Sequence, residues 1–262
     1  MAKVLIKELQ SYKKQYAVPR KTLIDNLEEA VVEEKKIEEM DVVFLMDRFG
    51  YAKTVDVSVY ERNKEAADTE NRYILTCKNT DKICIFTNKG QMHLLKVLDL
   101  PYGKFRDKGI PIDNLSNYNS SEENFIYIIN LGAIIHSRLL FGTKTAMLKM
   151  VDGSEFDVAK RTTASTKLNE DDELLIVHAM TGEETVVMQS EKEMFLRIEA
   201  STIPEKKKGA VGVRGMKLNA GDALSNIYVL DGESEQTVEV KGKEVVLNRL
   251  RVGNRDTKGT KR

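Results

Sequence analysis

Basic side chains recur beside glycine or small residues in three connecting segments of this chain of 262 residues. The segments are PYGKFRDKGIPI (101–112), DVAKRTTASTKL (157–168) and PEKKKGAVGVRGMKL (204–218). Lysine and arginine neutralise phosphates without reading bases, and glycine lets a backbone with free amide groups approach closely. The pattern indicates phosphate binding, although solvated surface loops are also rich in lysine and glycine.

A fourth basic stretch, RVGNRDTKGTKR (251–262), adds to these clusters: from residue 249 onward there are six basic residues and one aspartate. Gly259 and the basic residues around it predict a flexible segment in the absence of a polyanion. The candidate phosphate-binding residues are Lys104, Arg106, Lys108, Lys160, Arg161, Lys167, Lys206, Lys207, Lys208, Arg214, Arg255, Lys258, Lys261 and Arg262.

Charge is segregated along the chain although the formal net charge is zero. Residues 28–39 carry six glutamates and two lysines, in contrast to the basic segment after residue 249. A polyanion-binding surface depends on where charges gather and not on their sum. Neutrality overall nevertheless fits a second hypothesis, a protein-binding module whose lysine-rich loops serve solubility.

No residues suggest catalysis, a metal site or a cofactor. Cys77 and Cys84 lie seven apart inside apolar runs, which is the pattern of buried free thiols and not of a zinc site. His93, His136 and His178 are scattered singly. A β-propeller enzyme would need convergent acids, histidines or metal ligands, and the sequence shows none.

The first 40 residues differ from the rest. Leu5, Leu9, Tyr12 and Tyr16 form one apolar stripe on a helix over residues 3–17, which Pro19 should stop. We expect a neighbouring domain to cover this stripe. Residues 28–40 are acidic enough to be a solvated linker or a short helix. With no long apolar run and no signal-peptide pattern, the chain is expected to be cytoplasmic.

From Asp41 onward, short strand-like runs repeat around similar turns. The turns end at residues 50, 90, 146, 193 and, in a looser copy, 242, which gives offsets of 40, 56, 47 and 49. The strand before each turn is almost entirely apolar and should be buried on both faces, whereas the strand after it is mixed and should expose one face. A later apolar run follows in each copy. A period near fifty residues favours a solenoid or propeller-like array, with the basic connections on one rim.

These residues resemble a known family. DVVFLMDRFGYAKTVD (41–56), DKICIFTNKGQMHLLKV (81–97), FRDKGIPIDNL (105–115) and KGAVGVRGMKLNAGD (208–222) are similar to the C-terminal β-pinwheel domain of the A subunit of bacterial type IIA DNA topoisomerases, DNA gyrase and topoisomerase IV. IKELQSYKKQYAVPRKT (6–22) resembles the end of the upstream breakage–reunion portion of such subunits.

The resemblance implies an all-β fold, a β-pinwheel over residues 41–262, after a helix and linker over residues 1–40. The pinwheel would be a propeller-like disc or spiral of about five four-stranded blades, four of them clear, with strands exchanged between neighbours. It further implies a nucleoid-associated domain, monomeric when isolated, that binds and bends double-stranded DNA. The domain would not be catalytic alone, but part of an ATP-dependent enzyme containing an ATPase-bearing B subunit and the rest of the A subunit.

One difference from the family pattern bears on whether the chain is more similar to gyrase or to topoisomerase IV. The gyrase subunit carries a heptad of the form QRRGG[RK]G after the strands of its first blade, and the corresponding stretch here, YERNKEAADTE (60–70), has no glycine. KKKGAVG (206–212) is nearer but lies in another blade and lacks paired arginines. The resemblance thus favours a topoisomerase IV-like role, and a gyrase wrapping domain with a divergent heptad is the alternative.

Overall fold

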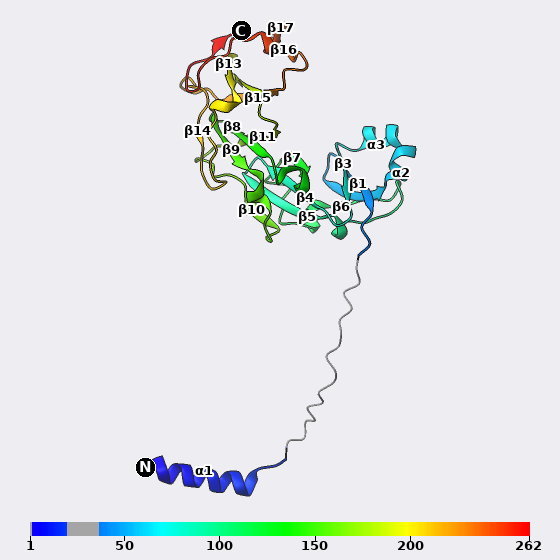
Figure 1. Cartoon of the computed structure of the whole chain (residues 1–262), viewed down its shortest axis with the longest axis vertical. Helices are drawn as coiled ribbons and strands as arrows, with labels where there is room; N and C mark the ends of the chain where they lie inside the picture. The colour runs from blue at the N-terminus through cyan, green and yellow to red at the C-terminus, as the bar shows by residue number, and fades with distance from the viewer. Residues whose placement is uncertain (1, 20–36) are drawn as a thin grey trace. The chain divides into compact units, whose positions relative to one another are not determined.

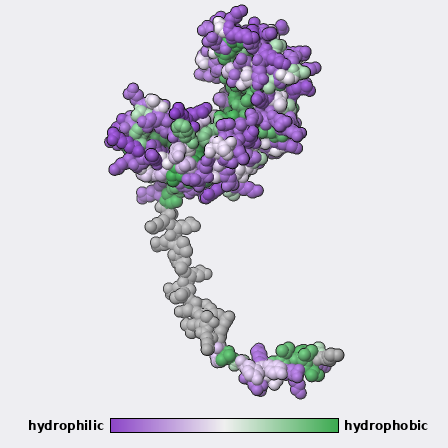
Figure 2. Space-filling model, turned by 180° about the vertical axis from the view of Figure 1, so that it is seen from behind, coloured by the Kyte–Doolittle hydropathy of each residue, from purple (hydrophilic) through white to green (hydrophobic). Residues whose placement is uncertain are grey.

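The computed structural model describes residues 2–19 and 37–262, and the chain divides into two compact units, Met1–Ile37 and Glu38–Arg262. In the first unit, α1 (Ala2–Tyr16) confirms the helix that was expected before Pro19. The four stripe residues, Leu5 among them, are each more than half exposed, and apolar side chains are visible on α1 in Figure 2. Of the acidic segment 28–40, residues 28–36 lie outside the described residues.

The second unit contains four four-stranded antiparallel sheets and a two-stranded hairpin (Figure 1). In spatial order the sheets are sheet A, β3-β1-β2-β6; sheet B, β7-β4-β5-β10; sheet C, β11-β8-β9-β14; and sheet D, β15-β12-β13-β18. The strand bounds are β1 Asp41–Met46, β2 Tyr51–Asp56, β3 Tyr73–Lys78, β4 Lys82–Thr87, β5 Gln91–Lys96, β6 Ile110–Pro111, β7 Phe125–Asn130, β8 Arg138–Thr143, β9 Met147–Asp152, β10 Thr162–Ala164, β11 Leu174–Met180, β12 Thr185–Ser190, β13 Met194–Glu199, β14 Val213–Arg214, β15 Leu224–Leu230, β16 Thr237–Val240, β17 Lys243–Val246 and β18 Thr260–Lys261. The remaining helices are α2 Val57–Arg62, α3 Lys64–Glu70, α4 Leu131–Ile134, η1 Val97–Asp99, η2 Ile112–Asn114, η3 Gly153–Phe156, η4 Ala200–Thr202 and η5 Leu247–Arg249.

Each sheet takes its outer strand from beyond the next hairpin. β6 follows the β4–β5 hairpin of sheet B but returns to pair with β2 of sheet A, and β10, β14 and β18 repeat this course. At the opposite edge, β3, β7, β11 and β15 contact one another in succession. The strand exchange predicted from the resemblance is confirmed, with four complete blades and a fifth represented by β16–β17.

The turn positions predicted from the sequence repeat coincide with turns in the structure. The residue that ends each hairpin turn has a positive φ: 86° at Gly50, 69° at Gly90, 63° at Ala146, 62° at Glu193 and 77° at Gly242. A left-handed residue closes these turns whether or not it is glycine. Counting from this residue therefore gives equivalent positions in all the sheets.

The core lies between successive sheets. Phe44 and Ile85 belong to the cluster that joins sheets A and B, Phe86 and Phe141 to that of sheets B and C, and Met188 to that of sheets C and D. β1, β4, β8 and β12 are buried along nearly their whole length, as their apolar sequences predict. Seen from behind, the surface of this unit is mainly hydrophilic (Figure 2).

The two terminal sheets are covered differently. Val43 and Leu45 on the free face of sheet A pack against Ala67 and its neighbours in α2–α3. At the other end, Val187 of sheet D packs against Leu247 and the β16–β17 hairpin. α2 and α3, which we call the helical insertion, thus cover the face of sheet A that no preceding blade covers.

Two sequence-based expectations are wrong. The strands after the turns do not expose a face: β5 and β9 are buried at four successive residues, because the returning loop and the neighbouring sheet cover them. The basic terminal segment is not simply a flexible tail either, since β18 pairs with Met194 and Phe195 and completes sheet D.

The two thiols are predicted to be inert in the folded protein. Cys77 and Cys84 are free and buried, and desolvation raises their pKa values to about 11 and about 12. Because the thiolate is the reactive form, at pH 7.5 Cys77 should react roughly 10²-fold and Cys84 roughly 10³-fold more slowly than an exposed cysteine. Labelling with a chromogenic disulfide reagent, in buffer and in denaturant, measures this; native-state labelling at the denatured rate would contradict it.

Candidate nucleic-acid interface

The four basic clusters occupy one structural position, the loop that leads into the outer strand of a sheet. Loop 101–109 enters β6, loop 157–161 enters β10, loop 204–212 enters β14 and loop 251–259 enters β18. We call these the rim loops. Most candidate cations lie in them; Arg214 and Lys261 lie in outer strands, and Lys167 and Arg262 follow them.

Twelve of the fourteen candidate side chains are exposed; the half-buried exceptions are Lys208 and Arg255. The Lys208 ammonium donates to the carbonyl oxygen of Glu155 at 2.8 Å, and Arg255 donates from Nη1 to the carbonyl oxygen of Arg214 at 3.0 Å. These two cations therefore hold loops together, and their charges are less available to an outside anion than those of the other twelve.

Some exposed cations have acidic neighbours. Arg214 pairs with Asp256 at 2.8 Å, Lys207 lies 3.4 Å from the Glu155 carboxylate and Arg161 lies 4.0 Å from Asp99. Exposed ion pairs of this kind stabilise a protein by ~1 kcal/mol or less. A phosphate could replace the carboxylate partner at low cost.

Cations from inside the sheets hold two of the rim loops from beneath. Lys53 of β2 donates to the carbonyl oxygens of Phe105 and Asp107. Lys149 of β9 donates to those of Lys207, Lys208 and Ala210, at 3.4, 2.7 and 2.8 Å. Both lysines lie three residues after the positive-φ turn residue of their sheet. The repetition of a lysine at this position could have been noticed in the sequence. It was overlooked because the strands after the turns were expected to expose one face, on which a lysine needs no explanation.

The other two sheets vary this arrangement. In sheet B the equivalent residue is His93, which is buried and contacts Thr162 and Glu123 at 3.1 and 3.2 Å instead of loop carbonyls. In sheet D, Arg197, one residue further along, donates to the carbonyl oxygens of Asn248 and Leu250.

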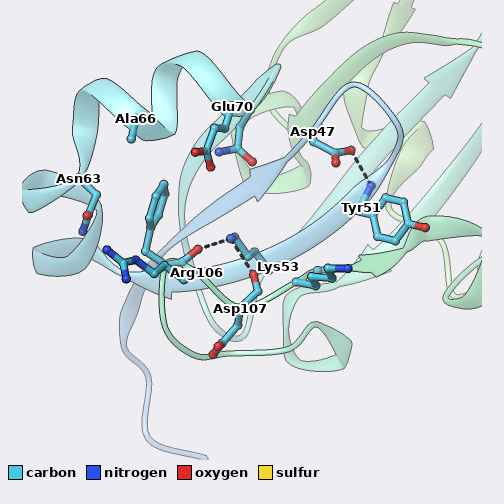
Figure 3. A pocket seen from close by; sticks show the side chains of 12 residues that line it. Asp47, Tyr51, Lys53, Asn63, Ala66, Glu70, Arg106 and Asp107 are labelled. Carbon is cyan, nitrogen blue, oxygen red and sulfur yellow. Dashed lines mark hydrogen bonds between the residues drawn. The ribbon is translucent and has the colours of Figure 1, made fainter.

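The helical insertion lies beside the first rim loop. A groove of about 800 Å³ is lined by Ala66 and Glu70 of α3 and by Arg106 and Lys108 of the loop (Figure 3). Figure 3 shows the hydrogen bonds from the Lys53 ammonium to backbone oxygens of the loop as dashed lines. Asp47 also lines the groove, so acidic side chains lie close to this basic cluster.

Comparison with solved structures identifies the architecture. The C-terminal domain of DNA topoisomerase IV superposes with a TM-score of 0.76 over 86% of this chain and 73% of that one, at 22% identity. The ParC C-terminal domain of E. coli gives 0.70 over 85% and 94%, at 15% identity, and a DNA gyrase A C-terminal domain gives 0.56 over 84% and 76%, at 17% identity. This chain resembles the C-terminal β-pinwheel domain of a type IIA topoisomerase A subunit. The resemblance predicted from sequence is thereby confirmed.

Sequence comparisons agree with the pinwheel assignment. The family described as "DNA gyrase C-terminal domain, beta-propeller" matches residues 137–178 and 184–231. The first stretch contains β8 to β10 and most of β11, and the second contains β12 to β15. The DNA gyrase A protein of Lawsonia intracellularis is 27% identical over 98% of this chain and 33% of its own length. That of Staphylococcus epidermidis is 29% identical over 97% and 30%. The chain thus spans about a third of these relatives.

Residues 60–70 correspond in position to the gyrase heptad. They lie in α2 and α3. The described residues contain no group of three or more histidine, cysteine or acidic side chains arranged to hold a metal ion. In the same part of the chain, no helix has the length and apolarity needed to cross a membrane.

Proposed function

We propose that residues 41–262 form a DNA-binding and DNA-bending domain of a type IIA topoisomerase A subunit, with residues 1–40 as the helix and linker that join it to the upstream portion. The observation that carries the proposal is the equivalent position of four basic rim loops beside the outer strands of a pinwheel. A duplex following that edge would meet a cluster at each sheet.

Binding by this edge would use phosphates and not bases. Lys104, Lys160 and Lys206 and their neighbours are exposed cations on successive loops, which suits counterion release by a duplex of any sequence. Bending 20–30 base pairs by 40–90° costs about 1–6 kcal/mol, which several phosphate contacts could offset.

The domain is proposed to be non-catalytic by itself. In the full enzyme it would act in the cytoplasm, on nucleoid DNA, together with an ATPase-bearing B subunit and the rest of the A subunit; in isolation it would be a monomer. The helices at the heptad position support topoisomerase IV-like capture of a bent segment rather than gyrase-like wrapping. Gyrase-like wrapping through a divergent heptad is the competing proposal.

A ligation experiment tests the proposal. Nicked circular duplex is sealed by ligase in the presence of the purified chain, and its linking number is compared with that of a protein-free control after deproteinisation. We expect salt-sensitive binding with little or no shift. A large shift of either sign would instead support gyrase-like wrapping, and neither shift nor binding would contradict DNA binding and favour a protein-interaction module.

A further inference from the structure

Lys149 is a lysine in the interior of a sheet, with 1% of its surface exposed. Its ammonium lies 5.4 Å from the ring centroid of Phe141 and donates to three carbonyl oxygens of rim loop 204–212. A buried ammonium is costly unless hydrogen bonds satisfy all its protons. Here a single loop supplies all three acceptors, so the lysine and the loop stabilise each other.

The hydrogen bonds from Lys149 to the loop carbonyls fix the direction in which the backbone N–H groups of the loop point. In a planar trans peptide, the carbonyl of one residue and the N–H of the next point in opposite directions. Since the carbonyls of Lys208 and Ala210 point inward to Lys149, the N–H groups of Gly209 and Val211 point outward. Neither N–H has a protein acceptor among the described residues.

The outward amides lie next to the exposed cations of the same loop. Lys206 and Lys207 are exposed, and the backbone N–H of Lys206 is bonded inward to Met150. Two free N–H groups in the same loop as two exposed ammonium groups form a set of donors suited to a phosphate. We infer that Lys149 is a positioning residue that holds this loop in its phosphate-binding conformation, an inference that rests on the proposed DNA binding.

The charge of Lys149 gives the inference a specific pH dependence. Burial lowers the pKa of Lys149 to about 8, and the Glu155 carboxylate on η3 opposes this shift. Glu155 is also contacted by two cations of the loop, since the Lys207 ammonium lies 3.4 Å from its carboxylate and the Lys208 ammonium donates to its carbonyl oxygen. As pH rises from 7 to 9.5, Lys149 loses the charge that attracts the carbonyls, and the loop should become less ordered.

Three single variants of the full chain test the inference: Lys149→Met, Lys149→Arg and, as a matched control, Lys53→Met. Hydrogen exchange without DNA should accelerate about tenfold in K149M at the amides of Lys206, Lys208 and Ala210, which are protected in this loop. The amides of Gly103 and Asp107 in the first rim loop should not change. K53M should give the reverse pattern.

Affinity for a 30-base-pair duplex at fixed salt completes the test. We expect K149M to bind about tenfold more weakly and K149R to stay within about threefold of the original chain. Affinity of the original chain should fall about tenfold between pH 7 and 9.5, whereas K149R, which keeps its charge, should lose much less.

The outcomes separate the two proposals. Unchanged exchange in folded K149M, or faster exchange with unchanged affinity, would overturn the positioning role. If K149M does not fold, identical pH profiles for the original chain and K149R would overturn it. If the original chain binds no duplex, DNA binding fails, while the exchange measurements still decide whether Lys149 orders the loop.

Discussion

Replacing both Lys206 and Lys207 by alanine is expected to reduce the slope of log K against log salt concentration, measured with duplex DNA, by about 1.8. Each phosphate contact contributes roughly 0.9 to that slope through counterion release. Both side chains are exposed, and Lys207 has only a 3.4 Å ion pair to lose. Lys208 is predicted to contribute less, because its ammonium donates to the Glu155 carbonyl.

A matched double variant isolates position from charge. Lys89→Ala with Lys192→Ala also removes two exposed lysines, from the hairpin turns between β4 and β5 and between β12 and β13. Titration at four or more salt concentrations should leave the slope of this control unchanged. An equal loss of slope in both double variants would show that general charge, and not the rim loop, determines binding.

Alanine at Gly212 should destabilise the domain by about 2–4 kcal/mol. Gly212 has a φ of 105°, and a Cβ atom there would lie 2.6 Å from the carbonyl oxygen of Leu148 in β9. The side chain would therefore combine backbone strain with a clash against backbone, which cannot be relieved by rotating a side chain. Because Gly212 directly precedes β14, the outer strand of sheet C should be displaced.

Gly209 in the same loop is the control. A Cβ atom at Gly209 would meet no atom within 4 Å, so Gly209→Ala should change the free energy of unfolding by ~0.5 kcal/mol or less. Denaturant unfolding followed by circular dichroism measures both variants. Equal free energies of unfolding for the two would refute the close-packing argument.

The hairpins were predictable because their signals are local. Apolar runs such as 42–46 and 83–86, a turn ending in a left-handed residue and a second run occur within about fifteen residues. The outer strands were not predictable, since two-residue strands such as Ile110–Pro111 and Val213–Arg214 are too short to show an alternation of apolar and polar residues. Their conformation is set by pairing with a strand far away in the sequence.

The candidate nucleic-acid interface was also predictable only where its signals are local in the sequence. Exposed cations such as Lys104 and Lys206 could be located from composition and repeat position alone. The role of Lys149 was not recognised, because a lysine in the mixed run MLKMV (147–151) suggests a strand with one exposed face, and only the returning loop provides its three acceptors. The helical insertion was likewise missed; its packing on Val43 and Leu45 is a tertiary contact.

Strand exchange between the sheets also constrains how the chain can be made and shortened. β2 ends at Asp56, but its outer neighbour begins at Ile110, after a complete hairpin of the next sheet has been synthesised. A nascent chain emerging from the ribosome therefore always holds at least one unfinished sheet, and each hairpin must wait for its successor. Truncation after Leu230 would remove β16–β17 and would also strip β18 from sheet D. Suitable end points for shortened versions consequently do not coincide with the last residue of a blade.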